Sequence, residues 1–187
     1  MTFASILPKI RSLRKALFLD RDGVINVDVG HTHRRESIVF IDGIFDLCRA
    51  ARSMEYLLIV VTNQSGIGRG YFSEDDFHTL MRWMQDRFAQ EGAPLDAVYF
   101  CPHHPEHGLG VYKQESQDRK PGPGMILRAQ QEHGIDLRRS ILIGDKDTDM
   151  QAAAGAGIGK SLLLAATASP QYGTVSSLRA AMPFFKP

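Results

Sequence analysis

The sequence has few cysteines, no long hydrophobic run and almost no excess of charge of either sign. Its 187 residues include two cysteines, Cys48 and Cys101, which are too few for a disulfide framework and favour a reducing compartment. The formal net charge of +1 gives no global field for nucleic acid or a membrane surface, so any anion-binding site must be local. The basic stretch 1–13 leads into an apolar run, 16–19, that is too short for a signal sequence or a membrane span. We therefore expect a cytoplasmic protein that binds neither nucleic acid nor membrane.

What the chain does contain is a regular alternation of apolar runs and helical patterns. The runs typical of buried strands are 16–19, 57–61, 97–100, 140–143 and 161–165. The segments that predict helices are 44–55, 73–92, 123–133, 148–156 and, more weakly patterned, 175–182. Strands and helices in this order predict an α/β fold, a parallel sheet with helices on both faces. With 43% hydrophobic and 23% charged residues, we expect one domain over residues 1–187, with its core at about 16–166.

Polar residues follow the first predicted strand, at the sheet edge where ligands bind in such folds. The sequence there is Asp20-Arg21-Asp22-Gly23. One carboxylate can attack phosphorus while the other exchanges a proton with the leaving oxygen and then with water. An ordinary Asp-Gly turn would give the same residues.

The second strand is followed by a polar segment, Thr62-Asn63-Gln64-Ser65-Gly66. Its hydroxyl, amide and backbone donors can hold the oxygens of a phosphoryl group, although a helix-capping loop has the same composition.

The fourth strand is followed by Asp145, which can complete an oxygen-rich magnesium site. Asp147 and Asp149 can instead cap the next helix, and Lys146 can reach a substrate or remain a solvated cation. Lys120, before Pro121, can act as a fixed cation on a phosphoryl group or form an ordinary surface pair with Arg119. Because these segments converge at one sheet edge, together they predict phosphoryl transfer.

The same segments resemble, in order, the four motifs of the haloacid dehalogenase (HAD) superfamily of phosphatases. The matching motifs are Leu19-Asp20-Arg21-Asp22-Gly23, Thr62-Asn63, Lys120-Pro121 and Gly144-Asp145. Longer matches, over 20–26, 62–67, 101–105 and 119–121, resemble the branch of heptose bisphosphate and histidinol phosphatases. The resemblance implies a Rossmann-like fold, and the segments 24–42 and 101–118 are too short to hold a cap domain.

The activity implied by this resemblance is a Mg²⁺-dependent removal of the 7-phosphate from D-glycero-D-manno-heptose 1,7-bisphosphate through an aspartyl phosphate. Such a reaction serves heptose nucleotide biosynthesis for lipopolysaccharide or other surface glycans. The chain length favours this substrate, and histidinol phosphate or another small phosphomonoester is the alternative. A non-catalytic binding protein on the same fold would have lost the motif acids, which this chain keeps. Nucleic-acid end processing is disfavoured by the near-zero net charge.

The resemblance also assigns roles to residues of this chain. Asp20 would be the nucleophile and Asp22 the acid and base, while Thr62 and Lys120 would stabilise the phosphoryl group. Magnesium would be held by Asp20, the backbone carbonyl of Asp22, and Asp145. The residues expected to bind the sugar phosphate are Asp28, Gly30, His31, Asn63, Gln64, Ser65, Arg119 and Lys146. We expect the protein to act as a monomer.

The long loop after the third strand departs from the pattern of the branch. Members of the branch usually carry a structural zinc there, held by Cys-x-His and a later Cys-x-Cys. Cys101 and His103 keep the first pair, but Ser116 and Asp118 stand at the second. Because structural zinc prefers thiolate and imidazole ligands, the sequence predicts severely weakened zinc binding and a loop held by other contacts.

Overall fold

The computed structural model describes residues 13–187, so nearly all of the basic stretch 1–13 lies outside the described residues. Six strands form one sheet, in the order β3-β2-β1-β4-β5-β6, and every neighbouring pair is parallel. The strands are β1 (Ala16–Leu19), β2 (Leu57–Asn63), β3 (Ala97–Cys101), β4 (Ile141–Gly144), β5 (Lys160–Leu164) and β6 (Thr174–Val175). The helices are α1 (Ile44–Ser53), α2 (Ser65–Gly68), α3 (Glu74–Gln90), α4 (Gly124–His133) and α5 (Asp147–Ala156). The predicted α/β architecture is confirmed.

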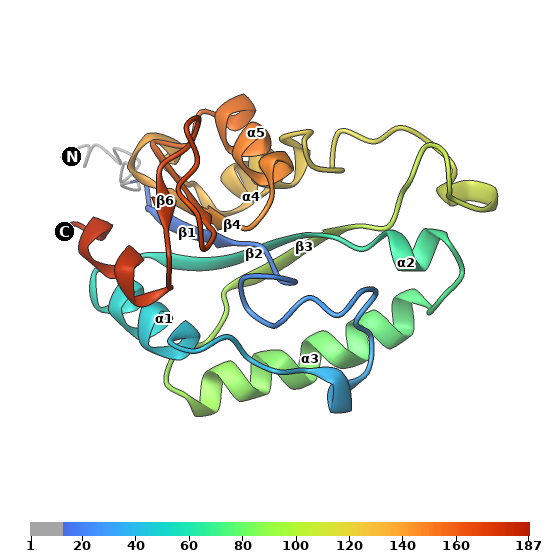
Figure 1. Ribbon diagram of the computed structural model, residues 1–187, viewed down its shortest axis with the longest axis horizontal. Helices are drawn as coiled ribbons and strands as arrows, with labels where there is room; N and C mark the ends of the chain where they lie inside the picture. Colours follow the sequence, from blue (N-terminus) through green and yellow to red (C-terminus); the bar gives the residue numbers. More distant parts are fainter. Residues whose placement is uncertain (1–12) are drawn as a thin grey trace, which may run out of the picture.

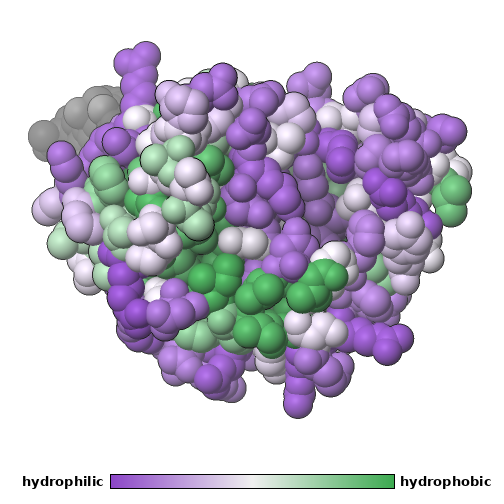
Figure 2. Space-filling model, viewed as in Figure 1, coloured by the Kyte–Doolittle hydropathy of each residue, from purple (hydrophilic) through white to green (hydrophobic). Residues whose placement is uncertain are grey.

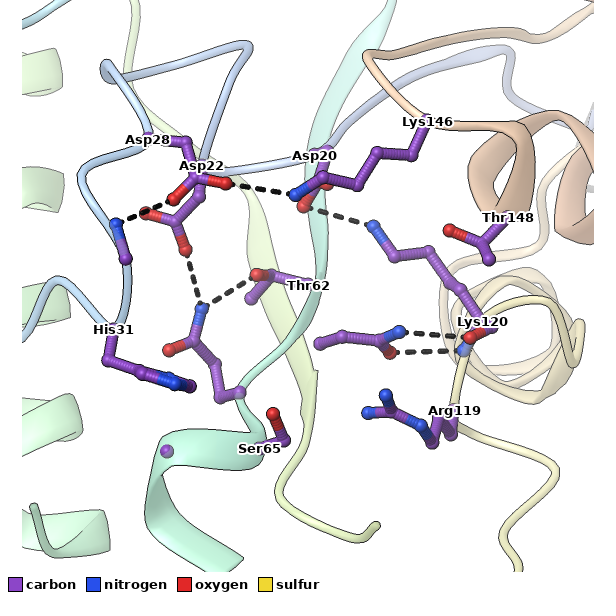
Figure 3. Close-up of a pocket in the computed structure, with 14 residues that line it drawn as sticks. Asp20, Asp22, Asp28, His31, Thr62, Ser65, Arg119, Lys120, Lys146 and Thr148 are labelled. Carbon is purple, nitrogen blue, oxygen red and sulfur yellow. Dashed lines mark hydrogen bonds and ion pairs between the residues drawn. The ribbon is translucent and has the colours of Figure 1, made fainter. Parts of the chain in front are cut away.

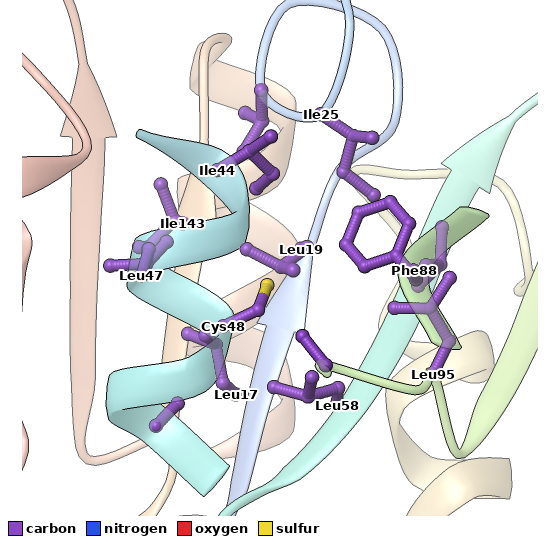
Figure 4. Close-up of a cluster of buried hydrophobic side chains, with 14 of the residues drawn as sticks. Leu17, Leu19, Ile25, Ile44, Leu47, Cys48, Leu58, Phe88, Leu95 and Ile143 are labelled. Carbon is purple, nitrogen blue, oxygen red and sulfur yellow. The ribbon is translucent and has the colours of Figure 1, made fainter. Parts of the chain in front are cut away.

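Helices cover both faces of the sheet, with α1 and α3 on one side and α4 and α5 on the other (Figure 1). Successive side chains of a strand point to opposite faces. Leu17 and Leu19 accordingly pack with α1 and α3, and Figure 4 shows this cluster around Cys48. Ala16 and Phe18 pack with α4 and α5. Because both faces are buried, β1 is a continuous apolar run rather than an alternating one.

The local signals in the sequence explain where the helices begin and end. At the start of α3, the Ser73 hydroxyl accepts a hydrogen bond from the backbone N–H of Asp76, whose carboxylate accepts one from Ser73 N–H. After α4, Gly134 adopts a left-handed conformation with φ of 63°, which glycine accommodates without steric penalty. The five predicted strands and the first four predicted helices lie within two residues of their expected limits.

The helix expected at 175–182 is wrong. Thr174 and Val175 form β6 instead, because they pair with Leu163 and Leu164 of β5. The following helix is a short 3-10 helix, Arg179–Phe184, that contains Pro183. Proline cannot donate a backbone hydrogen bond and restricts the residue before it, which limits a regular α-helix there.

The register of the central strands brings their carboxyl ends together. Leu19 of β1 lies opposite Val60 of β2 and Ile143 of β4. The segment between β1 and α1 crosses in front of α3 (Figure 1). Figure 2 shows a patch of hydrophobic side chains on this face of the molecule, and the segment between β1 and α1 contains the exposed Val27, Val29 and Val39. None of the helices within 13–187 combines the length and apolar character needed to cross a bilayer.

Candidate active site

Three buried charged side chains meet at the carboxyl edge of the sheet. The Lys120 ammonium donates to Asp20 Oδ1 at 3.0 Å and lies 2.5 Å from Asp149 Oδ1. It also donates to the carbonyl of Val61 at 3.0 Å, so three oxygen atoms surround the ammonium group. Burial by itself lowers the pKa of Lys120, but the two carboxylates outweigh burial and raise it. The lysine is therefore a fixed cation beside Asp20 (Figure 3).

The carboxylates of Asp20, Asp145 and Asp149 form an acidic cluster, with ligand atoms within 4.8 Å of one another. Burial, aided by the neighbouring carboxylates and opposed by Lys120, raises the pKa of Asp20 to about 7. Burial also raises the pKa of Asp145 to about 6, and its buried Oδ1 has no hydrogen-bond partner among the described residues. Crowded carboxylates with an unused buried oxygen fit a hard divalent cation such as Mg²⁺.

Gly23 lets the backbone pass close to this cluster. Its φ is +91°, and a Cβ at this position would lie 2.2 Å from Asp145 Oδ2. Any side chain here would displace Asp145, so the turn after β1 requires glycine.

The Gln64 side-chain amide hydrogen-bonds to both Asp22 and Thr62. Gln64 Nε2 donates to Thr62 Oγ1 at 2.8 Å and to Asp22 Oδ2 at 3.0 Å. Figure 3 shows Asp22 and Lys120 on opposite sides of the pocket, with Asp20 and Thr62 between them. The predicted acid/base and the fixed cation therefore flank the predicted nucleophile.

Asn63 contacts the backbone of Lys120 through both ends of its amide. Its Oδ1 accepts from Lys120 N–H at 3.0 Å, and its Nδ2 donates to Lys120 C=O at 2.9 Å. This geometry positions the loop that carries Lys120. The substrate-binding role expected of Asn63 stays a prediction.

The rim of the pocket carries the other predicted substrate-binding residues. Lys146 Nζ donates to Asp28 Oδ2 at 2.9 Å, and Gly30 N–H donates to Asp28 Oδ1 at 3.0 Å. Burial lowers the pKa of Lys146, but Asp28 and Asp145 outweigh it and raise the value to about 12. Every residue predicted for catalysis or sugar-phosphate binding lines one pocket of about 350 Å³, namely Asp20, Asp22, Asp28, Gly30, His31, Thr62, Asn63, Gln64, Ser65, Arg119, Lys120 and Lys146.

Comparisons with known proteins agree with this geometry. A family model described as HAD-hydrolase-like matches residues 117–174. The D-glycero-alpha-D-manno-heptose-1,7-bisphosphate 7-phosphatase of Burkholderia mallei is 58% identical over 163 residues, which cover 87% of this chain and 86% of that relative. The chain belongs to this family of HAD-like phosphatases. It is therefore a phosphoric monoester hydrolase by family. The D-glycero-beta-D-manno-heptose-1,7-bisphosphate 7-phosphatase of Vibrio cholerae is 51% identical and covers 81% of each chain.

Solved structures of similar proteins support the same family. A D,D-heptose 1,7-bisphosphate phosphatase from B. bronchiseptica, complexed with magnesium and phosphate, is 28% identical with a TM-score of 0.78 and covers 90% of this chain and 96% of its own. A HAD-like phosphatase from Mesorhizobium loti is 34% identical with a TM-score of 0.81, covering 94% and 89%. The Rossmann-like HAD fold is confirmed.

Asp149 is a functional residue for which the sequence predicts only a helix cap. It does cap α5, because its Oδ2 accepts from Lys146 N–H at 3.0 Å. Its other oxygen faces Lys120 and belongs to the acidic cluster. The signal available in the sequence was its place in the first turn of the helix that directly follows Asp145.

The residues at the expected zinc positions make other contacts. His103 Nδ1 lies 3.2 Å from Gln114 Nε2, and Asp118 Oδ2 accepts from Arg128 at 2.7 Å. Burial raises the pKa of the Cys101 thiol. Within residues 13–187, the one group of three or more candidate ligands is the acidic cluster. The weakened zinc binding stays a prediction.

Proposed function

We propose that this protein hydrolyses the 7-phosphate of D-glycero-D-manno-heptose 1,7-bisphosphate. The observation that carries the proposal is the Lys120–Asp20 contact of 3.0 Å inside a pocket that also holds Asp22. A carboxylate nucleophile, an acid/base two residues later and a buried cation are the groups that an aspartyl-phosphate mechanism needs. The names of the most similar relatives support the substrate.

The reaction consists of two displacements at phosphorus. A carboxylate oxygen of Asp20 attacks and forms an aspartyl phosphate, while the bond to the sugar oxygen breaks and Asp22 supplies that oxygen with a proton. Asp22 then takes a proton from water, whose oxygen attacks the same phosphorus, so that inorganic phosphate leaves and Asp20 is regenerated. Lys120 and the Thr62 hydroxyl offset the charge on the phosphoryl oxygens throughout.

Magnesium belongs to this proposal because the donor set fits it. Asp20, the backbone carbonyl of Asp22, and Asp145 would hold the ion, and Asp149 lies beside them. When bound, the ion neutralises charge on the phosphoryl group and allows the anionic substrate to enter a cluster of carboxylates.

The pocket rim supports a sugar carrying a second phosphate. Arg119 and Lys146 place cationic groups around the opening, and Ser65, Gly30 and His31 line it. Among the described residues, the Arg119 guanidinium makes one hydrogen bond, to the His103 carbonyl at 3.2 Å, which leaves most of its donors for a ligand.

The oligomeric state, the cellular compartment and the domain organisation of the protein are also part of the proposal. The monomeric state stays a prediction. The two thiols, Cys48 and Cys101, are buried and unpaired, which supports a reducing compartment such as the cytoplasm. The one-domain organisation over 1–187 stays a prediction.

The experiment is a phosphate-release assay on both anomers of the bisphosphate and on histidinol phosphate. We expect Mg²⁺-dependent release of one phosphate per heptose bisphosphate and little turnover of histidinol phosphate. Both anomers are needed because the 58% identical relative is named for the alpha form and the 51% identical one for the beta form. Absence of phosphate release from both anomers with Mg²⁺ present would refute the proposed substrate.

A further inference from the structure

Arg21, the residue between the two motif carboxylates, is completely buried, and almost all of its bonding is to Asp22. Its Nη2 lies 2.7 Å from Asp22 Oδ2 and 3.0 Å from Oδ1, and its Nε lies 3.1 Å and 3.2 Å from the same two oxygens. One other hydrogen bond is made, from Nη2 to the Thr32 carbonyl at 2.7 Å. The remaining nitrogen, Nη1, has no partner among the described residues. Two guanidinium nitrogens thus each contact both oxygens of the Asp22 carboxylate.

The two oxygens of Asp22 have different surroundings. Oδ1 also accepts from Asn26 Nδ2 at 2.9 Å, and Asn26 is fully buried. Oδ2 also accepts from Gln64 Nε2, which lines the pocket and bridges to Thr62. Oδ1 is therefore anchored on the protein side, and Oδ2 is the oxygen on the side of the reaction.

We infer that Arg21 is a positioning residue, which fixes the Asp22 carboxyl so that Oδ2 exchanges the proton with the leaving sugar oxygen and then with water. This inference rests on the proposed function, because it gives Asp22 the acid/base role. When Oδ2 carries the proton, Oδ1 still accepts from Arg21 and Asn26, so the orientation persists through both half-reactions. Proton transfer requires heavy-atom separations close to those of a hydrogen bond, and a misplaced carboxyl loses it.

The several donors of arginine are what this role requires. Two guanidinium nitrogens contact both oxygens and hold the carboxylate at more than one point, whereas a lysine ammonium is a point charge that allows it to turn. Arg21 is itself held by the Thr32 carbonyl and by the Phe77 ring, whose centroid is 5.8 Å from its guanidinium carbon. The pair is therefore fixed from the interior rather than by the substrate.

The test compares a substrate that needs the proton with one that does not. In a sugar phosphate the leaving group is the sugar oxygen, which departs as an unstable alkoxide unless it is protonated. In p-nitrophenyl phosphate the leaving group is p-nitrophenolate, which is stable without a proton. In Arg21→Lys and Arg21→Gln, we expect kcat/KM for heptose bisphosphate to fall about 100-fold, within the range of general acid catalysis. For p-nitrophenyl phosphate we expect kcat/KM to change less than about 3-fold, because kcat/KM counts only the steps up to departure of the leaving group.

The matched control is Arg128→Lys, which alters an exposed arginine–carboxylate pair with Asp118 outside the pocket and should leave both substrates unchanged. A double-mutant cycle gives a second test. In an Asp22→Asn background, Arg21→Lys should change kcat/KM for heptose bisphosphate by less than about 2-fold, because both changes remove the same function.

Equal losses on both substrates, or fully additive losses in the cycle, would overturn the inference. So would failure of both Arg21 variants to fold, judged by thermal unfolding, since that would give the arginine a role in the fold instead. If the unmodified protein dephosphorylates another alkyl phosphate rather than heptose bisphosphate, the proposed substrate fails, and the same comparison with that ester still tests Arg21.

Discussion

The carboxyl edge of the sheet and the long loop after β3 both concentrate charged and polar side chains, but they hold them differently. At the sheet edge, Lys120 and Asp149 are nearly inaccessible, and Lys120 forms ion pairs with both Asp149 and Asp20. In the loop, Asp118 and its partner Arg128 are partly exposed, with side chains 30% and 44% accessible. Buried charges depend on their partners for stability, whereas water and ions screen the exposed pair.

The comparison indicates that the catalytic charges are preorganised at the sheet edge and not in the loop. The register of β1, β2 and β4 brings the loops that carry these charges to one edge of the sheet, and burial holds the charges in place before a substrate arrives. The loop is ordered mainly by backbone bonds, such as Leu109 N–H to Gly68 C=O at 2.7 Å. Matched changes in the two regions should therefore have very unequal effects.

The largest contrast is expected between Asp20→Asn and Asp118→Asn, which make the same chemical change. Asp20→Asn removes the nucleophile and should lower kcat by more than about 10⁴-fold. Asp118→Asn should change kcat less than about 2-fold, because only an exposed pair is altered. Steady-state phosphate release measures both, and residual turnover of Asp20→Asn near the unmodified rate would exclude the mechanism.

The second contrast concerns stability. Lys120→Met leaves Asp20 and Asp149 without their shared cation, and we expect a loss of roughly 3–5 kcal/mol in the free energy of unfolding. Arg128→Met should lower it by less than about 1 kcal/mol, since its pair with Asp118 is solvent-screened. Urea denaturation of the metal-free proteins distinguishes the two, and equal losses would break the comparison.

The third prediction concerns the dependence of stability on pH and metal. The pKa values of Asp20 and Asp145 are raised in the folded state to about 7 and about 6. The folded state therefore binds these two protons more tightly than the unfolded state, in which the pKa of an Asp carboxyl is about 4. The resulting stabilisation of the metal-free fold is fully present below about pH 4 and is lost as pH rises through 6 and 7. In EDTA, the thermal midpoint should rise as pH falls from about 8 to 5, as far as these two groups determine it.

Magnesium should reverse this trend at high pH, where the carboxylates are ionised and bind it. At about 100 times its Kd, the ion adds about 2.7 kcal/mol. Asp145→Asn should reduce that increment. A midpoint unaffected by Mg²⁺ at pH 8 would contradict the assignment of the acidic cluster as its site.

The smallest effect is expected from rebuilding zinc ligands in the loop. Ser116→Cys with Asp118→Cys would add two thiolates to Cys101 and His103, and Ser116 already lies within hydrogen-bonding reach of the Cys101 thiol. We expect the double variant to bind one zinc and to gain a few degrees in thermal midpoint, since about 1 kcal/mol shifts a chain of this size by roughly 2–4 °C. Equal zinc content in the unmodified protein would show that Ser116 and Asp118 suffice.

Much of the fold was predictable because its signals are local. Apolar runs such as 57–61 mark strands, and Ser73 with Asp76 marks a helix start. The element β6 was not predictable, because Thr174 and Val175 become a strand only by pairing with β5. The helix α2 was missed for a related reason, since its four residues, Ser65–Gly68, are too short to show a period.

The α/β class, the motif acids and the family to which they belong were all predictable from the sequence, because these depend on residue type, order and spacing. Only the tertiary structure decided how the acids are used. In the structure, Lys120 lies between Asp20 and Asp149, the Asn63 amide binds the backbone of Lys120, and the Arg21 guanidinium contacts the Asp22 carboxylate. Most of these contacts join segments distant in the chain, and all depend on side-chain direction and burial, which packing sets and no local pattern encodes.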